Sequence, residues 1–220
     1  TVLFPTFSAV DESMDRSGAL YRRSVAFVFM MLFPVCLLAV AFAREGLHFW
    51  LGADFANNST WVVRWLALGV LWNSVAMIPY TLVQGRGRPD LTARLHMFEL
   101  LPYLALMWVC IKTWGITGAA IAWSARTGVD AIVLFWFAAR MQPTPARFRR
   151  GGIAVVVMII AAVVLAAMPV SVPVRGALVL ATSALVILAV FGLMLDRQDR
   201  SALGRMAGRV VMARFATPRA

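Results

Sequence analysis

The sequence has 220 residues, of which 61% are hydrophobic and 14% are charged, and its mean hydropathy is +0.80. Soluble domains average roughly 45–50% apolar and about 25% charged residues. A chain this apolar has too few polar residues to cover the surface of a soluble globule of its size. The composition therefore indicates a membrane protein.

The net charge of +11 comes almost entirely from arginine, because Lys112 is the only lysine. In a soluble protein such an excess would point to nucleic acid. Here the arginines lie between long apolar runs, so we expect no nucleic-acid partner. The two cysteines, Cys36 and Cys110, lie inside apolar runs, which indicates core packing and argues against a disulfide scaffold or a cysteine metal site.

The chain begins without Met, and residues 1–10 (TVLFPTFSAV) read like the end of a preceding transmembrane helix. We therefore expect the chain to start within a longer protein. Residues 11–195 then hold six apolar runs, each long enough to cross a hydrocarbon core of about 30 Å at about 1.5 Å per residue. The predicted spans are 24–42, 61–83, 95–111, 116–139, 153–168 and 176–195.

These runs are continuous, whereas the strands of membrane barrels alternate over about 10 residues. The predicted fold class is therefore all-α, a polytopic membrane helix bundle of about six transmembrane helices. Residues 44–60 form the longest outer connection. The basic tail, 196–220, has an amphipathic pattern that fits a helix on the inner leaflet, with a disordered tail as the alternative.

Positive charge alternates strictly along the predicted topology. Sixteen arginines lie before the first span, between the second and third, between the fourth and fifth, and after the sixth, against Arg44, Lys112 and Arg175 in the other connections. Because Lys and Arg concentrate on the cytoplasmic side, both termini are predicted to be cytoplasmic. Five tryptophans fall at the predicted outer interface, as an aromatic belt would: Trp50, Trp61, Trp65, Trp108 and Trp114.

Four charged residues lie within the predicted spans: Arg64, Glu99, Arg126 and Asp130. A charge at the bilayer centre costs roughly 2.5–3.5 kcal/mol on insertion scales, so each of these residues is expected to have a partner or a function. Arg126 and Asp130 share one helix face at i,i+4 spacing, and form either a self-neutralising ion pair or the lining of a hydrated cavity. That face is predicted to point toward the second and third spans or toward a part of the longer protein that this chain lacks.

Glu99 can meet Asp130 or Arg126 across the bundle, or sit at headgroup level. His96, one turn earlier, is predicted to be interfacial. Arg64 lies near the outer end of its span, where it either snorkels to headgroups or contributes to the cavity. Pro34, Pro79 and Pro102 predict kinks in the first three spans.

No enzyme signature is recognisable: the chain has two histidines, no nucleophile triad and no phosphate-binding glycine loop. We expect a protein that is not an enzyme, has no cofactor and has no metal site.

Four stretches in a fixed order carry a resemblance to a known family. They are 3–8 (LFPTFS) with 20–24 (LYRRS), 49–55 (FWLGADF), 78–90 (IPYTLVQGRGRPD) with His96 and Glu99, and 115–123 (GITGAAIAW) with Arg126 and Asp130. Over about residues 1–140 the chain resembles the carboxyl-terminal part of the Wzx-type polysaccharide flippases. Their superfamily also contains the multidrug MATE exporters and the lipid II flippases. The last two spans match only in hydropathy.

The resemblance implies a two-lobed MATE-like bundle, with most of the second lobe in this chain. It also implies a substrate, an oligosaccharide on undecaprenyl pyrophosphate that crosses the bacterial inner membrane. Charged cavity residues matter in this family, and Arg126, Asp130 and Glu99 are the matching positions here. The expected partners are the lipid-linked oligosaccharide, membrane lipids and proteins of polysaccharide assembly.

The function predicted on this basis is a lipid-linked oligosaccharide flippase for surface polysaccharide biosynthesis. It would work by alternating access around a cationic cavity, with Arg126, and Arg64 as a second candidate, binding the pyrophosphate. Asp130 or Glu99 are candidate proton carriers. Three alternatives stay open: a drug or small-molecule exporter of the same superfamily, a membrane-embedded polysaccharide-assembly enzyme, and an inert assembly subunit.

Overall fold

The computed structural model describes residues 14–142 and 170–194, together with the single positions 152, 156, 160, 163, 164 and 168. Over these residues all regular secondary structure is helical and no strand occurs, which confirms the predicted all-α class. The elements are α2 (Met14–Ala41), α3 (Ala43–Leu51), α4 (Ala53–Gly85), α5 (Pro89–Met141), α7 (Val172–Ala189) and the π-helical turn η1 (Val190–Met194).

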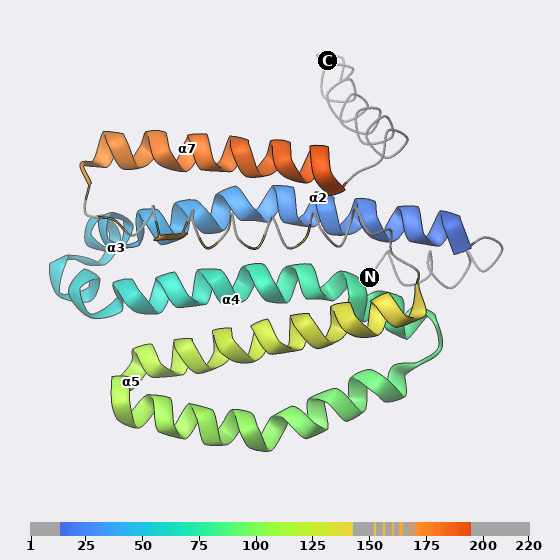
Figure 1. Cartoon of the computed structure of the whole chain (residues 1–220). Helices are drawn as coiled ribbons and strands as arrows, with labels where there is room; N and C mark the ends of the chain where they lie inside the picture. Colours follow the sequence, from blue (N-terminus) through green and yellow to red (C-terminus); the bar gives the residue numbers. More distant parts are fainter. Residues whose placement is uncertain are drawn as a thin grey trace, which may run out of the picture.

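The long helices form a row in which α7 lies beside α2, α2 beside α4, and α4 beside α5 (Figure 1). Within the described part of the chain, four helices are long and apolar enough to cross a membrane: Ser17–Ala41, Ala53–Gly85, Pro89–Met141 and Val172–Gly192. The bundle therefore has two ends. One end carries α3, and the opposite end carries the turn between α4 and α5.

The predicted outer connection, 44–60, is not a loop. Residues Ala43–Leu51 form α3, and α4 begins at Ala53, well before the apolar run that starts near Trp61. Hydropathy marks only the part of a helix that lies in lipid, so the polar first turns of α4, with Asp54, Asn57 and Asn58, were not recognised as helical. Gly52, at φ 90°, provides the corner between the two helices.

The predicted third and fourth spans, 95–111 and 116–139, lie in the two arms of α5. The arms meet at Gly115, whose φ of 58° and ψ of −135° break the helix, and they run back alongside each other (Figure 1). Close to this corner the arms nearly touch, because a Cβ on Gly118 would lie 1.8 Å from the carbonyl oxygen of Cys110. Small residues let membrane helices approach this closely.

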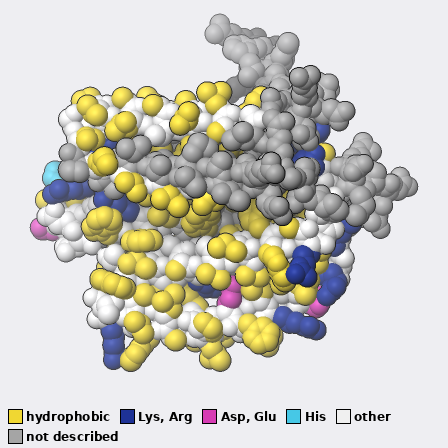
Figure 2. All heavy atoms as spheres, in the orientation of Figure 1, with side chains coloured by type: hydrophobic (Ala, Val, Ile, Leu, Met, Phe, Trp, Pro, Cys, Tyr) yellow, Lys and Arg dark blue, Asp and Glu magenta, His cyan; other side chains and the backbone are white. Residues whose placement is uncertain are grey.

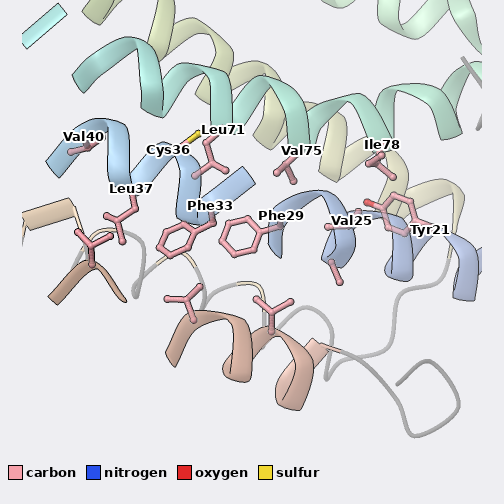
Figure 3. Packing of buried hydrophobic residues seen from close by; sticks show 14 of the residues in the cluster. Tyr21, Val25, Phe29, Phe33, Cys36, Leu37, Val40, Leu71, Val75 and Ile78 are labelled. Carbon is pink, nitrogen blue, oxygen red and sulfur yellow. The ribbon is translucent and has the colours of Figure 1, made fainter. Parts of the chain in front are cut away.

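The packed core lies between α2 and its neighbours α4 and α7 (Figure 3). Phe29 and Phe33 of α2 stack with ring centroids 5.3 Å apart, and both are buried. Leu71 and Val75 of α4 pack on the same cluster, as does Val179 of α7. Because lipid is as apolar as these side chains, the packing stabilises the bundle through dispersion and shape rather than through exclusion of water.

The outside of the bundle is mostly hydrophobic. In the face shown by Figure 2, hydrophobic side chains cover the middle, whereas Lys and Arg gather mainly toward the two ends. Large apolar side chains stand exposed on α2, α5 and α7, among them Met31, Leu101 and Leu180 at 61%, 76% and 73%. This surface suits hydrocarbon and confirms a membrane helix bundle.

Several predictions lie outside the described residues: the helix end at 1–10, most of the fifth span at 153–168, and the tail at 196–220. The sixth predicted span, 176–195, corresponds to α7 and η1 up to residue 194. Pro34, Pro79 and Pro102 each lie inside a long helix, α2, α4 and α5 respectively, and none of them ends its helix.

Replacing Gly118 with Ala is expected to destabilise the protein, because the new methyl group would collide with backbone at Cys110. Overpacking typically costs about 1–3 kcal/mol, and a backbone neighbour cannot swing aside. The measurement is the Tm of the complete purified protein in detergent. The control is Gly128→Ala on the same arm, where the nearest atom, Cδ1 of Trp72, is 3.9 Å away. Equal Tm values for the two variants would contradict the close crossing of the arms.

Candidate functional site

The structure brings together three of the four charged residues that the sequence singled out. Glu99 comes from the first arm of α5, and Arg126 and Asp130 come from the second arm. The corner at Gly115 makes this possible, because it folds the two arms against each other. Arg64 lies elsewhere, on α4.

Arg126 pairs across the arms with Glu99. Its Nε lies 3.5 Å from Oε2 of Glu99, and its guanidinium lies 5.2 Å from the centre of the Tyr103 ring. Among the described residues no ion pair forms between Arg126 and Asp130. The face that carries both residues points toward the first arm, which corresponds to the predicted third span.

His96, for which the sequence predicts an interfacial position, belongs to the same cluster. Its Nδ1 lies 3.7 Å from Oε2 of Glu99, one turn away on the same arm. Its ring lies 6.3 Å from the ring of Tyr80 on α4. The nearest ligand atoms of His96, Glu99 and Asp130 all lie within 4.8 Å of one another. The i,i+3 spacing of His96 and Glu99 was the signal available in the sequence.

The carboxylates of this cluster are buried without full hydrogen bonding. Within the described part of the chain, both oxygens of Glu99 and Oδ1 of Asp130 are buried and accept no hydrogen bond. The side chain of Glu99 is 11% exposed, against 30% for Arg126 and 41% for His96. Buried polar groups without partners cost free energy, so the cluster is suited to receive a further donor or a proton.

A cavity of about 280 Å³ opens beside Arg126 between the two arms. Its walls are mainly apolar, and Glu99 and Arg126 supply the charged groups. The lining residues are Phe98, Glu99, Pro102, Tyr103, Leu106, Ala125, Arg126 and Val129. Arg126 therefore borders both the buried acids and an accessible space.

His96, Glu99 and Asp130 are residue types that also bind metal ions, and they are close enough to share one. The adjacent guanidinium of Arg126 argues against such an ion, because it already brings a positive charge to Glu99. The arrangement fits an anion at Arg126 better than a second cation beside it.

Arg64 lies at the α3 end of the bundle, away from the other three residues. Its Nε donates a hydrogen bond of 3.1 Å to the carbonyl oxygen of Val40, and its guanidinium lies 4.9 Å from the Trp61 ring centre. Val40 is in the last turn of α2, where carbonyls lack helical partners and attract cations. Arg64 thus caps α2, a role that sequence reasoning did not consider.

Arg175, from the first turn of α7, caps the same helix end. It donates to the carbonyl oxygen of Ala41 at 3.2 Å and to Oε1 of Glu45 at 2.5 Å. Its side chain is 12% exposed. These contacts tie α7 to the junction of α2 and α3.

A second polar cluster joins the helices at the opposite end. Arg86 donates to Oε1 of Gln142 and to Oγ of Ser17, and Nε2 of Gln84 donates to Oγ1 of Thr92 at 2.9 Å. These residues come from α2, from α4 and its following turn, and from both ends of α5. The bundle is therefore tied by hydrogen bonds at each end.

Comparison with known proteins gives one curated relative. The chain is 35% identical over 139 residues to a protein of Shigella flexneri named "Putative O-antigen transporter". The match covers 63% of this chain and 33% of the relative, so the chain spans about a third of that protein's length. No protein-family model and no solved structure matches the chain. The match confirms the resemblance to polysaccharide transporters that the sequence motifs carry.

Arg175→Ala is expected to lower the free energy of unfolding by about 1–3 kcal/mol, because Glu45 and the end of α2 lose a partly buried partner. The double variant Arg175→Ala with Glu45→Ala is expected to recover part of the loss, since no acid is then left unpaired. Thermal unfolding of the complete protein measures the stability of the single and the double variant. Arg44→Ala is the control, because Arg44 is exposed and its hydrogen bond to Asn57 is long, at 3.4 Å. A double variant no more stable than Arg175→Ala would contradict the pairing.

Proposed function

We propose that this chain is part of a flippase that moves a lipid-linked oligosaccharide across the bacterial inner membrane. The oligosaccharide would be carried on undecaprenyl pyrophosphate and used for surface polysaccharide biosynthesis. Similarity to a protein named as an O-antigen transporter supports this class of substrate. The helix bundle and its apolar exterior support a location within the membrane.

The observation that carries the proposal is the position of Arg126. It lies eleven residues from the corner at Gly115, or about 16 Å along the arm, close to the middle of a hydrocarbon core of about 30 Å. It borders a cavity between the arms and is 30% exposed. A cation maintained at this depth beside open space is expected where a negatively charged group must pass.

A pyrophosphate substrate requires a cation of this kind inside the bilayer. A pyrophosphate entering the bilayer loses its hydration, at a cost that is prohibitive unless cations and hydrogen-bond donors replace the water. A guanidinium offers several donors in a plane and can bind two phosphate oxygens at once. Glu99 would give Arg126 a temporary partner while no substrate is bound.

Transport would proceed by alternating access, with this chain supplying most of one lobe and the missing remainder of the protein supplying the other. The hydrogen bonds at both ends of the bundle support movement of α2, α4, α5 and α7 as one body. The side of α5 that carries Arg126 and the cavity would then face the other lobe. Glu99 or Asp130 would carry protons if an ion gradient drives the cycle.

Arg126→Ala is expected to abolish most surface polysaccharide when the complete gene is returned to its deletion strain, and to cause lipid-linked intermediate to accumulate inside. Arg126→Lys is expected to restore only part, because an ammonium lacks the planar donors of a guanidinium. The control is Lys112→Ala, since Lys112 packs on Trp108 outside the cluster. Full polysaccharide display with Arg126→Ala would refute the proposed role. Drug sensitivity with normal polysaccharide in the deletion strain would favour the small-molecule exporter.

The proposed topology places both termini in the cytoplasm. Reporter fusions to the complete protein after Gln84, Pro143 and Asp196 are expected to read cytoplasmic, and fusions near Asn57 and Val172 are expected to read periplasmic. The physical reason is the asymmetry of arginine along the sequence. Inverted readings at two of these sites would overturn the orientation.

A further inference from the structure

Glu99 lies between two groups that can each carry positive charge. One oxygen, Oε2, is 3.5 Å from Nε of Arg126 on the second arm and 3.7 Å from Nδ1 of His96 on its own arm. Neither oxygen of Glu99 accepts a hydrogen bond from the described residues. The carboxylate is therefore close to both partners but hydrogen-bonded to neither.

The surroundings of His96 favour a role for this residue in the site. Among the described residues, Tyr80 of α4 and Asp130 of the second arm lie near its ring, and Arg126 of the second arm approaches the same Glu99 oxygen. Its ring remains partly accessible, with a side chain 41% exposed, whereas Glu99 is nearly buried. Among the described side chains that contact the buried acid, His96 is thus more accessible than Arg126, which is 30% exposed.

An anionic headgroup at Arg126 competes with Glu99 for the same guanidinium. When the headgroup binds Arg126 in place of Glu99, the buried Glu99 carboxylate is left without a partner. This costs free energy unless another cation lies nearby. His96 is the group within reach. A small movement of one side chain would transfer the carboxylate from the guanidinium to the imidazole.

We propose that His96 is a positioning residue that receives Glu99 when an anionic lipid headgroup binds Arg126. This inference rests on the proposed function. A protonated imidazole attracts the carboxylate and leaves Arg126 free, so the headgroup binds more tightly. A neutral imidazole leaves Glu99 on Arg126, so the headgroup binds more weakly. Because acid favours the protonated form of an imidazole, binding is expected to strengthen as the pH is lowered.

The test measures the Kd of the complete purified transporter for undecaprenyl pyrophosphate-linked N-acetylglucosamine in lipid nanodiscs, from about pH 5 to about pH 8. The pyrophosphate of this probe is esterified at both ends, so its charge stays constant over the range. Wild-type protein is expected to bind several-fold more tightly at the acidic end.

His96→Gln is expected to bind weakly at every pH, because a neutral amide cannot attract Glu99 from Arg126. Glu99→Gln is expected to bind tightly at every pH, because nothing then competes for Arg126, and the double variant is expected to match Glu99→Gln. His48→Gln is the control. It alters the chain's other histidine, which is exposed on α3, and is expected to keep the wild-type profile.

A wild-type pH profile in His96→Gln would overturn the role of His96, as would weak binding by Glu99→Gln. The failure of the proposed function has a different signature. In that case the probe binds no variant at any pH, or Arg126→Ala binds it as tightly as wild type does. Either of these outcomes would also remove the basis for the role of His96.

Discussion

Charged groups in a bilayer must find partners inside the protein, and the fold of this chain depends on that constraint. A single unpaired ion at the bilayer centre would cost roughly 2.5–3.5 kcal/mol on insertion scales. The corner at Gly115 answers the constraint, because it folds one arm of α5 onto the other and so places Glu99 beside Arg126. At the end that carries α3, Arg64 and Arg175 bind the carbonyls that α2 cannot satisfy.

The two kinds of arginine illustrate how position decides function. Arg64 and Arg175 donate to backbone carbonyls at a helix end, where their task is to hold elements together. Arg126 instead meets a carboxylate and an aromatic ring beside a cavity. A cation that is partly exposed beside a cavity can also serve a ligand, which is why Arg126 is the central residue of the proposed function.

The sequence predicted the helical class, the charged residues within the spans, and Arg126 as one of two partners for Glu99. It missed α3, whose nine residues are too few for a membrane-spanning apolar run, and it missed the polar first turns of α4. It also missed the pairing of Arg64 with Val40. That contact depends on how far α4 slides along α2, a register that packing sets and periodicity does not show. The contact of His96 with Glu99 needs no such register, because the two residues lie one turn apart on the same arm.

The most direct test asks whether the side of α5 that carries Arg126 and the cavity faces water or lipid. A single cysteine at Val129, which lines the cavity, is placed in the complete transporter with Cys36 and Cys110 replaced by Ser. A cysteine at Leu188, exposed on α7, serves as the lipid-facing reference. Thiols react as thiolates, which require water. The account predicts that a polar thiol reagent labels position 129 and not position 188, and that accumulated lipid-linked oligosaccharide protects position 129. Equal resistance of both positions would contradict it, because the face that carries Arg126 would then lie against lipid.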